Sequence, residues 1–168
     1  ELERISEALA SAAAGGSSCA VIVGAAGVGK TRLVSESLRG RRDLTVIAGR
    51  GDPLRKRSAL APFKQALRSL FGVRLRAARR DASIMYDQTA RAITDVLIVE
   101  SAARPTVLWL EDLHHIDSTS VVLISEVLRR VRSLCVLVTA RPEALLDFPI
   151  FARHASQVEL SPLDEDWC

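Results

Sequence analysis

The stretch VIVGAAGVGKT, residues 21–31, decides the fold of this chain. It opens on an apolar run typical of a buried strand, and the residues after it, 30–38, repeat apolar positions at helical spacing. The eight residues GAAGVGKT, 24–31, match the pattern G-x-x-x-x-G-K-[ST]. Because this pattern joins a predicted strand to a predicted helix, it predicts a phosphate-binding loop.

The residue types in the loop fit the chemistry of a bound phosphate. Glycine lets the backbone come close to the anion and turn several N–H groups towards it, and Gly24, Gly27 and Gly29 supply that freedom. The helix that follows adds its unpaired N–H groups and the positive end of its dipole. The predicted nucleotide-binding residues are Gly24, Ala25, Ala26, Gly27, Val28, Gly29, Lys30, Thr31 and Arg32.

Two side chains of the loop have separate predicted roles. Lys30 is expected to place its charge on the β and γ phosphates of a nucleotide. The hydroxyl of Thr31 is a hard oxygen ligand of the kind that Mg²⁺ prefers. The alternative, a glycine-rich turn with an incidental lysine, is disfavoured by the strand before the loop and the helix after it.

The rest of the chain alternates short apolar runs with amphipathic ones. Strands are predicted at 19–23, 44–48, 106–110, 135–139 and 157–160, and helices at 1–13, 30–38, 62–71, 85–100 and 118–131. The strand segments are almost continuously apolar, which indicates burial on both faces. The alternation predicts an α/β protein of three layers, a P-loop fold with a mainly parallel five-stranded sheet flanked by helices, in a single domain over 1–168.

Two acids follow the third predicted strand. Glu111 and Asp112 stand at the edge where ligands bind in open α/β sheets, and a strand tip holds a carboxylate stiffly. We predict that Glu111 holds the metal, directly or through a water, and that Asp112 polarises the attacking water, although the two roles are interchangeable. With Thr31 these acids form the predicted metal ligands. The alternative is a pair of ordinary surface acids.

An arginine follows the fourth predicted strand. If that strand is a parallel neighbour of the strand before the phosphate loop, Arg141 lies at the same edge of the sheet. Its planar guanidinium matches phosphate oxygens, so its position favours a contact with the γ phosphate over an exposed loop arginine before Pro142. The predicted catalytic residues are Lys30, Asp112 and Arg141.

Other polar features have plainer interpretations. Asp117 precedes STS and an apolar helix, which is typical of an N-cap. His114 and His115 are adjacent and should point apart, with no further Cys or His at ligand spacing, which disfavours a transition-metal site. The basic run RLRAARR, 74–80, is typical of a solvated face or loop, with contact to nucleic-acid phosphates as the alternative.

Composition sets the outer limits. The chain has 168 residues, of which 48% are hydrophobic, and that is enough for a core of its own. A net charge of +3 does not by itself imply nucleic acid, and no stretch has the length of a membrane-spanning helix. Cys19 and Cys135 lie inside apolar runs, where a reduced thiol behaves as a small hydrophobe. We therefore predict a cytoplasmic protein without a membrane partner.

Several segments along the chain form a characteristic combination: VIVGAAGVGKTRL, GRGDPL followed by ALAPFKQALR, VLWLEDLHHID, VTARPE and the closing QVELSPL. Together they resemble the ATPase domain of the STAND signal-transduction ATPases, and most specifically the large ATP-binding regulators of the LuxR type and cyclase-linked relatives. They span nearly the whole chain. Many families share the phosphate loop, whereas the combination of LEDLH with TARPE is much narrower.

The resemblance implies ATP and Mg²⁺ as cofactors and a particular strand order. The strand that carries the acids is separated from the phosphate-loop strand by the strand before Arg141, so Arg141 lies beside Lys30. The same order implies that Cys19 and Cys135 lie on neighbouring strands as core thiols. The family also implies that a helical lid and a winged-helix domain follow, that the full-length protein self-associates, and that any nucleic acid is bound through another domain.

The predicted function is an ATP-binding and hydrolysing switch module of a bacterial signalling or transcriptional regulator. His115 departs from the family, which often has tryptophan at that position, and the sequence begins after the position of the usual GRE segment. One alternative is a DNA-handling AAA+ ATPase, which normally has asparagine where this chain has TAR, 139–141. Another is a scaffold that binds nucleotide without turnover.

Overall fold

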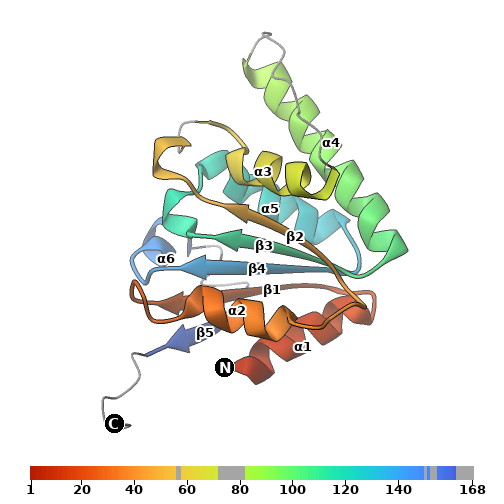
Figure 1. Cartoon of the computed structure of the whole chain (residues 1–168). Coiled ribbons are helices and arrows are strands. Elements are labelled where there is room, and N and C mark those ends of the chain that lie inside the picture. Colours follow the sequence, from red (N-terminus) through yellow and green to blue (C-terminus); the bar gives the residue numbers. More distant parts are fainter. Residues whose placement is uncertain (56–57, 72–81, 150, 152–154, 162–168) are drawn as a thin grey trace, which may run out of the picture.

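The computed structural model of the chain is a five-stranded sheet between two layers of helices (Figure 1). It describes residues 1–168 except 56–57, 72–81, 150, 152–154 and 162–168. The strands are β1 (Ser17–Gly24), β2 (Thr45–Arg50), β3 (Thr106–Glu111), β4 (Leu134–Ala140) and β5 (Ser156–Leu160). The helices are α1 (Leu2–Ala13), α2 (Lys30–Leu38), α3 (Ala61–Phe71), α4 (Ala82–Ala103), α5 (Ser118–Arg130) and α6 (Ala144–Asp147), with 3-10 turns η1 (Pro53–Arg55) and η2 (Leu113–His115).

All neighbouring strands are parallel, in the order β2-β3-β4-β1-β5. This sheet confirms the predicted fold class. It also has β4 between the acid-bearing strand β3 and the phosphate-loop strand β1, as the resemblance implied. Because the strands are parallel, their carboxyl ends meet at a single edge, where the loops carry the predicted site residues.

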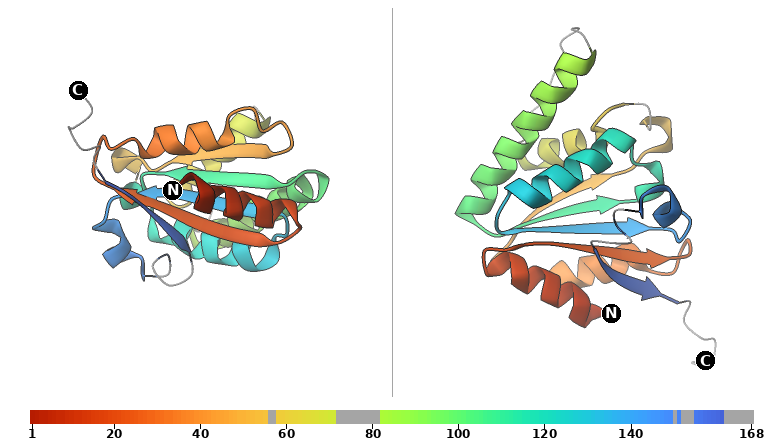
Figure 2. Two further views of the ribbon diagram at one scale, coloured as in Figure 1. Left: turned by 90° about the horizontal axis from the view of Figure 1, so that it is seen from below. Right: turned by 180° about the vertical axis from the view of Figure 1, so that it is seen from behind.

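The helices divide between the two faces of the sheet. Helices α1 and α2 cover one face, and α3, α4 and α5 cover the other (Figures 1 and 2). Successive residues of a strand point to opposite faces, so the inner strands contribute to both cores. In β3, for example, Val107 packs in the core beneath α1 and α2, whereas Leu108 packs in the core beneath α3, α4 and α5.

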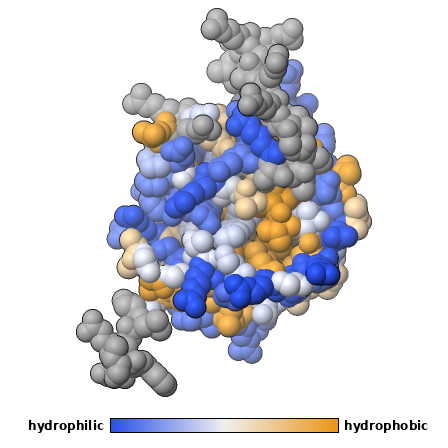
Figure 3. Space-filling view, in the orientation of Figure 1, coloured by the Kyte–Doolittle hydropathy of each residue, from blue (hydrophilic) through white to orange (hydrophobic). Residues whose placement is uncertain are grey.

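Burial differs between inner and edge strands. Every residue of β4 is buried, as predicted for a strand covered on both faces. The prediction is wrong for β2, where exposed and buried residues alternate and Val46 is 40% exposed. Strand β2 is an edge strand, and α1 and α2 lie over the other end of the sheet, so one face of β2 meets solvent (Figure 1). Figure 3 shows hydrophobic surface in this region.

The predicted elements are present with shifted bounds. Strand β2 runs to Arg50, two residues beyond the predicted end, and α4 is longer than predicted at both ends. The single turn α6 and the turns η1 and η2 were not predicted. The basic run 74–80 lies outside the described residues. No described helix is both long enough and apolar enough to span a bilayer.

The two inner cysteines lie on paired strands, as the resemblance implied. In the register of β1 and β4, Ser18 is opposite Cys135 and Cys19 is opposite Val136. Both thiols are free. Burial raises the pKa of Cys19 to about 12 and that of Cys135 to about 11, so both stay protonated and pack as small apolar groups.

Asp117 caps α5, which confirms its predicted role. Its Oδ1 accepts a hydrogen bond from the backbone N–H of Ser120 at 2.9 Å, and its Oδ2 accepts one from the Ser120 hydroxyl at 2.7 Å. The same carboxylate accepts a 3.3 Å hydrogen bond from the backbone N–H of Leu60, just before α3. A single buried side chain therefore joins the starts of two helices that pack on the same face.

Candidate active site

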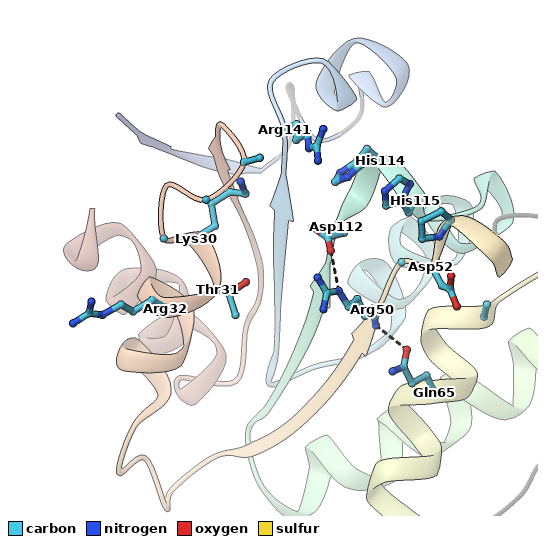
Figure 4. A pocket seen from close by; sticks show the side chains of 16 residues that line it. Lys30, Thr31, Arg32, Arg50, Asp52, Gln65, Asp112, His114, His115 and Arg141 are labelled. Atoms are coloured by element: carbon cyan, nitrogen blue, oxygen red, sulfur yellow. Dashed lines mark hydrogen bonds and ion pairs between the residues drawn. The ribbon is translucent and has the colours of Figure 1, made fainter. Parts of the chain in front are cut away.

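A cavity of about 1050 Å³ opens at the carboxyl edge of the sheet (Figure 4). Residues from the phosphate loop, the end of β2, the start of α3, the β3–η2 junction and the end of β4 line it. Among them are Lys30, Thr31, Asp112 and Arg141, which the sequence analysis placed in one site. This volume is slightly above the range of about 300–1,000 Å³ that is typical of clefts for small ligands.

The phosphate loop has the backbone that its glycines predict. Gly27 and Gly29 have φ of 78° and 98°, a left-handed conformation that other residues adopt only with strain. Gly24 is needed for a different reason, because a Cβ there would lie 2.9 Å from the backbone oxygen of Leu160 on β5. Gly29 is also the N-cap position of α2, so the N–H groups of its first turn face the cavity edge.

Not every predicted loop residue borders the cavity. Those that do are Ala26, Gly27, Gly29, Lys30, Thr31 and Arg32, whereas Gly24, Ala25 and Val28 are not among the lining residues. Arg32 lies on the first turn of α2, and its guanidinium is directed away from Lys30 (Figure 4). Of the two basic residues here, Lys30 is therefore the better placed to contact a phosphate in the cavity.

Lys30 is held over the loop by backbone oxygens. Its Nζ donates to Gly24 O at 2.8 Å and to Ala25 O at 2.7 Å. Burial lowers the pKa of Lys30, the charge of Asp112 raises it, and the charge of Arg141 lowers it again. The Lys30 ammonium group is therefore close enough to Asp112 and Arg141 for their charges to act on it.

The two acids of β3 differ in their surroundings. The side chain of Asp112 lines the cavity, and its backbone N–H donates to Thr139 Oγ1 on β4 at 3.1 Å. The side chain of Glu111 is only 16% exposed and is not among the lining residues. Burial raises the pKa of Glu111, the charge of Arg50 lowers it, and the charge of Asp112 raises it. Of the two acids, Asp112 is therefore the one that borders the cavity.

Sequence reasoning missed Arg50. Its Nε lies 2.9 Å from Asp112 Oδ2 and 3.6 Å from Glu111 Oε2, and its backbone N–H donates to Gln65 Oε1 at 3.1 Å (Figure 4). In the register of β2 and β3, Arg50 stands opposite Glu111. The segment GRGDPL could have pointed to Arg50, but the predicted strand ended at residue 48 and Arg50 was assigned to a loop.

The glycines on either side of Arg50 allow close packing. A Cβ on Gly49 would lie 2.2 Å from the backbone oxygen of Pro62, and a Cβ on Gly51 would lie 2.5 Å from that of Asp112. No side chain fits at either position without a backbone shift. The segment GRG thus brings α3 and the β3–η2 junction against the end of β2, with Arg50 between them.

Arg141 and the two histidines complete the wall of the cavity. Figure 4 shows the His114 ring between Arg141 and Asp112. Burial lowers the pKa of His114, and so does the charge of His115. The expectation that the histidines point apart is wrong, because their ring centroids are 4.0 Å apart within η2. No group of three or more His, Cys, Asp or Glu in the described part of the chain has the arrangement of a metal site.

Residues 1–138 match the family model described as the AAA ATPase domain. The chain belongs to this family. The match covers the phosphate loop, the acids Glu111 and Asp112, and β4 as far as residue 138. The family implies nucleotide binding, in agreement with a cavity bordered by a phosphate loop.

Two solved structures, the first two described here, support the fold of this AAA ATPase domain. Cdc6p from Pyrobaculum aerophilum superposes with a TM-score of 0.71 at 16% identity, over 98% of this chain and 45% of that one. The structure of Drosophila ORC bound to AT-rich DNA and Cdc6 gives 0.55 at 17% identity, over 98% and 56%. A STAND protein with a tetratricopeptide repeat sensor from Pyrococcus horikoshii gives 0.43 at 15% identity, over 96% and 23%.

The chain spans about half the length of the first two of these structures. No curated protein sequence matches it. At 16–17% identity, the similarity to the first two structures is evidence of a shared fold alone.

The donor groups of this AAA ATPase domain suit a nucleotide with Mg²⁺. A hydroxyl oxygen of Thr31 and a carboxylate of Asp112 border the same cavity, and both are hard oxygen ligands. Lys30 and Arg141 supply positive charge for phosphate oxygens on the same edge. The polar groups therefore separate into cations for phosphate and oxygen ligands for a divalent metal.

Proposed function

We propose that this domain binds ATP with Mg²⁺, hydrolyses it, and serves as the switch module of a bacterial signalling or transcriptional regulator. One observation carries the proposal. Lys30, Asp112 and Arg141 come from the ends of three different strands or the loops after them, and all three line the same cavity. Phosphoryl transfer depends mainly on such positioning and on the electrostatic stabilisation that charged groups give.

Each residue has a defined task in this proposal. Lys30 and the first turn of α2 bind the β and γ phosphates, and Thr31 offers its hydroxyl oxygen to the metal. Glu111 holds the metal directly or through a water, while Asp112 accepts a hydrogen bond from the attacking water and orients it. Arg141 contacts the γ phosphate. Mg²⁺, when bound, neutralises charge on the β and γ oxygens.

The position of Arg141 supports a switch role. It stands directly after β4, and its backbone oxygen accepts a hydrogen bond from Ala144 N at the start of α6. On α6, Leu146 is 85% exposed. Loss of the γ phosphate would release Arg141, and a movement of Arg141 would shift the start of the exposed turn α6. The resemblance to LuxR-type regulators supports the regulatory output.

The test combines nucleotide binding, turnover and DNA binding on the same protein. We expect ATP to bind in calorimetry and phosphate to be released only with Mg²⁺, with no salt-dependent shift of a DNA duplex. Tight ATP binding without phosphate release would favour the scaffold instead. A DNA shift that weakens steeply with salt would favour the DNA-handling ATPase, since phosphate contacts release counterions.

A further inference from the structure

We propose that Arg50 is a built-in counter-ion for the acids of β3, and that Mg²⁺ binds only as the Arg50 guanidinium leaves them. Metal binding and the release of Arg50 are then one exchange. This inference rests on the proposed function, because it concerns the same metal and the same cavity. Arg50 is then a competitor of the metal for the acids.

The geometry gives Arg50 a contact with both acids. Its Nε is 2.9 Å from Asp112 Oδ2 and 3.6 Å from Glu111 Oε2. The carboxylate of Asp112 is also the one that borders the cavity. A guanidinium at this position neutralises both acids and occupies an oxygen of Asp112, so Arg50 and a metal compete for the same pair of carboxylates.

The backbones on both sides of this contact are fixed. Asp112 N donates to Thr139 Oγ1, Arg50 N donates to Gln65 Oε1, and Gly51 N donates to Glu111 O at 2.8 Å. Strand pairing sets Arg50 opposite Glu111. The two backbones therefore cannot separate, and any exchange must come from rotation of a side chain.

Exposure decides which partner moves. The side chain of Arg50 is 64% exposed, against 16% for Glu111 and 26% for Asp112. Two neighbouring carboxylates repel each other unless a cation stands beside them. Arg50 supplies that cation, but an exposed ion pair is weak and can be displaced by a divalent ion with its higher charge.

The released guanidinium stays within the cavity. Arg50, Lys30 and Arg141 all line it, so a nucleotide phosphate can accept Arg50 after the exchange. Mg²⁺ then replaces Arg50 beside the acids. Arg50 joins Lys30 and Arg141 as a third cation for the phosphates. Both the nucleotide and the metal therefore favour the Arg50 side chain turned away from the acids and towards the phosphates.

The first test uses Mn²⁺ as a spectroscopic substitute for Mg²⁺, since both prefer oxygen ligands. Free Mn²⁺ is titrated by electron paramagnetic resonance against the nucleotide-free protein, and against Arg50→Gln, Arg50→Lys and Arg39→Gln. Arg39, the residue directly after α2, forms an exposed ion pair with Glu36 and serves as a charge-matched control. We expect Arg50→Gln to bind Mn²⁺ roughly fivefold more tightly. Arg50→Lys and Arg39→Gln should stay within about twofold of the wild type.

Unchanged or weaker Mn²⁺ binding by Arg50→Gln would overturn the inference. An equal gain in Arg39→Gln would also overturn it, because a general loss of positive charge would then explain the effect. Circular dichroism and thermal unfolding verify that the variants are folded. Since no nucleotide is present, the titration decides the inference even if the proposed function fails.

The second test measures ATP binding by calorimetry at increasing Mg²⁺. The Mg²⁺ concentration at half-maximal binding should fall in Arg50→Gln by the same factor as the Mn²⁺ constant. Binding of ATP in EDTA should not become stronger, because Arg50 is itself a phosphate partner. If the wild type binds ATP and the Mg²⁺ midpoint does not change in the variant, the inference fails and the proposed function stands. If the wild type binds no ATP, the proposed function fails.

Discussion

The Lys30 ammonium is held in place by two carbonyl oxygens of its own loop, and Lys30 lines the cavity. We expect Lys30→Ala to lower ATP affinity at least about 30-fold, because hydrogen bonds to charged groups contribute about 1.5–3 kcal/mol each. Neither core contains this side chain, so the far-ultraviolet circular dichroism should not change. Calorimetry measures the affinity.

The matched control for Lys30 is another lysine. Lys64 on α3 donates to Ala59 O at 2.9 Å and is not among the residues that line the cavity. Lys64→Ala should bind ATP as the wild type does. An unchanged ATP affinity in Lys30→Ala would contradict the assignment of the phosphate loop.

Asp112 allows turnover to be separated from binding. Asparagine keeps the size of the side chain and the backbone contact to Thr139, but it is a poor proton acceptor. We expect Asp112→Asn to lower phosphate release by about 100-fold or more while ATP still binds, because the loss of a positioned base lowers rate rather than ground-state affinity. Single-turnover and binding measurements on the same preparation test both halves.

A Glu111 variant provides the comparison for Asp112→Asn. Its predicted partner is the metal, so Glu111→Gln should raise the Mg²⁺ concentration needed for half-maximal turnover more than it lowers the maximal rate. Hydrolysis at the parent rate in Asp112→Asn would make Asp112 a surface acid. An exchange of the two phenotypes would instead show that the roles are reversed between the two acids.

At the scale of elements, the Asp117 carboxylate joins α5 to the segment before α3. Asp117→Ala leaves the N–H groups of Ser120 and Leu60 without this acceptor. We expect the free energy of unfolding to fall by about 2 kcal/mol, the sum of a lost N-cap and a buried N–H without its bond. Urea unfolding measures the loss.

The control is an acid of another helix. Asp95 is exposed on α4, so Asp95→Ala should change the free energy of unfolding by less than about 0.5 kcal/mol. Equal stability of Asp117→Ala and the wild type would mean that solvent replaces the cap. That outcome would exclude Asp117 as the connection between the two helices.

Local patterns predicted most elements but not the contacts between them. Apolar spacing was sufficient for the strands and for α1, α2, α3 and α5, and the loop pattern located Lys30. Arg50 was missed because its ion pair joins residues 62 apart in the chain, and no local pattern records a partner at that distance. The proximity of His114 and His115 depends on the 3-10 turn, which periodicity did not reveal.

At the scale of the whole molecule, the sheet belongs to two cores at once. Val21 and Val23 of β1 pack in the core beneath α3, α4 and α5, whereas Ala20 and Ile22 pack in the core beneath α1 and α2. Strands β3 and β4 alternate in the same way. Neither core can lose its packing without exposing the strands of the other, so we expect a single unfolding transition.

That coupling predicts how the ligand affects stability. A ligand that binds only the folded state at 100 times its dissociation constant adds about 2.7 kcal/mol, and a domain of this size gains about 2–4 °C per kcal/mol. Saturating ATP with Mg²⁺ should therefore raise the midpoint of the entire transition by about 5–10 °C in calorimetry. Lys30→Ala should show no comparable rise. Two transitions, of which only one responds to ATP, would mean that the edge carrying the cavity unfolds apart from the sheet, and would contradict the shared strands as the cause of cooperativity.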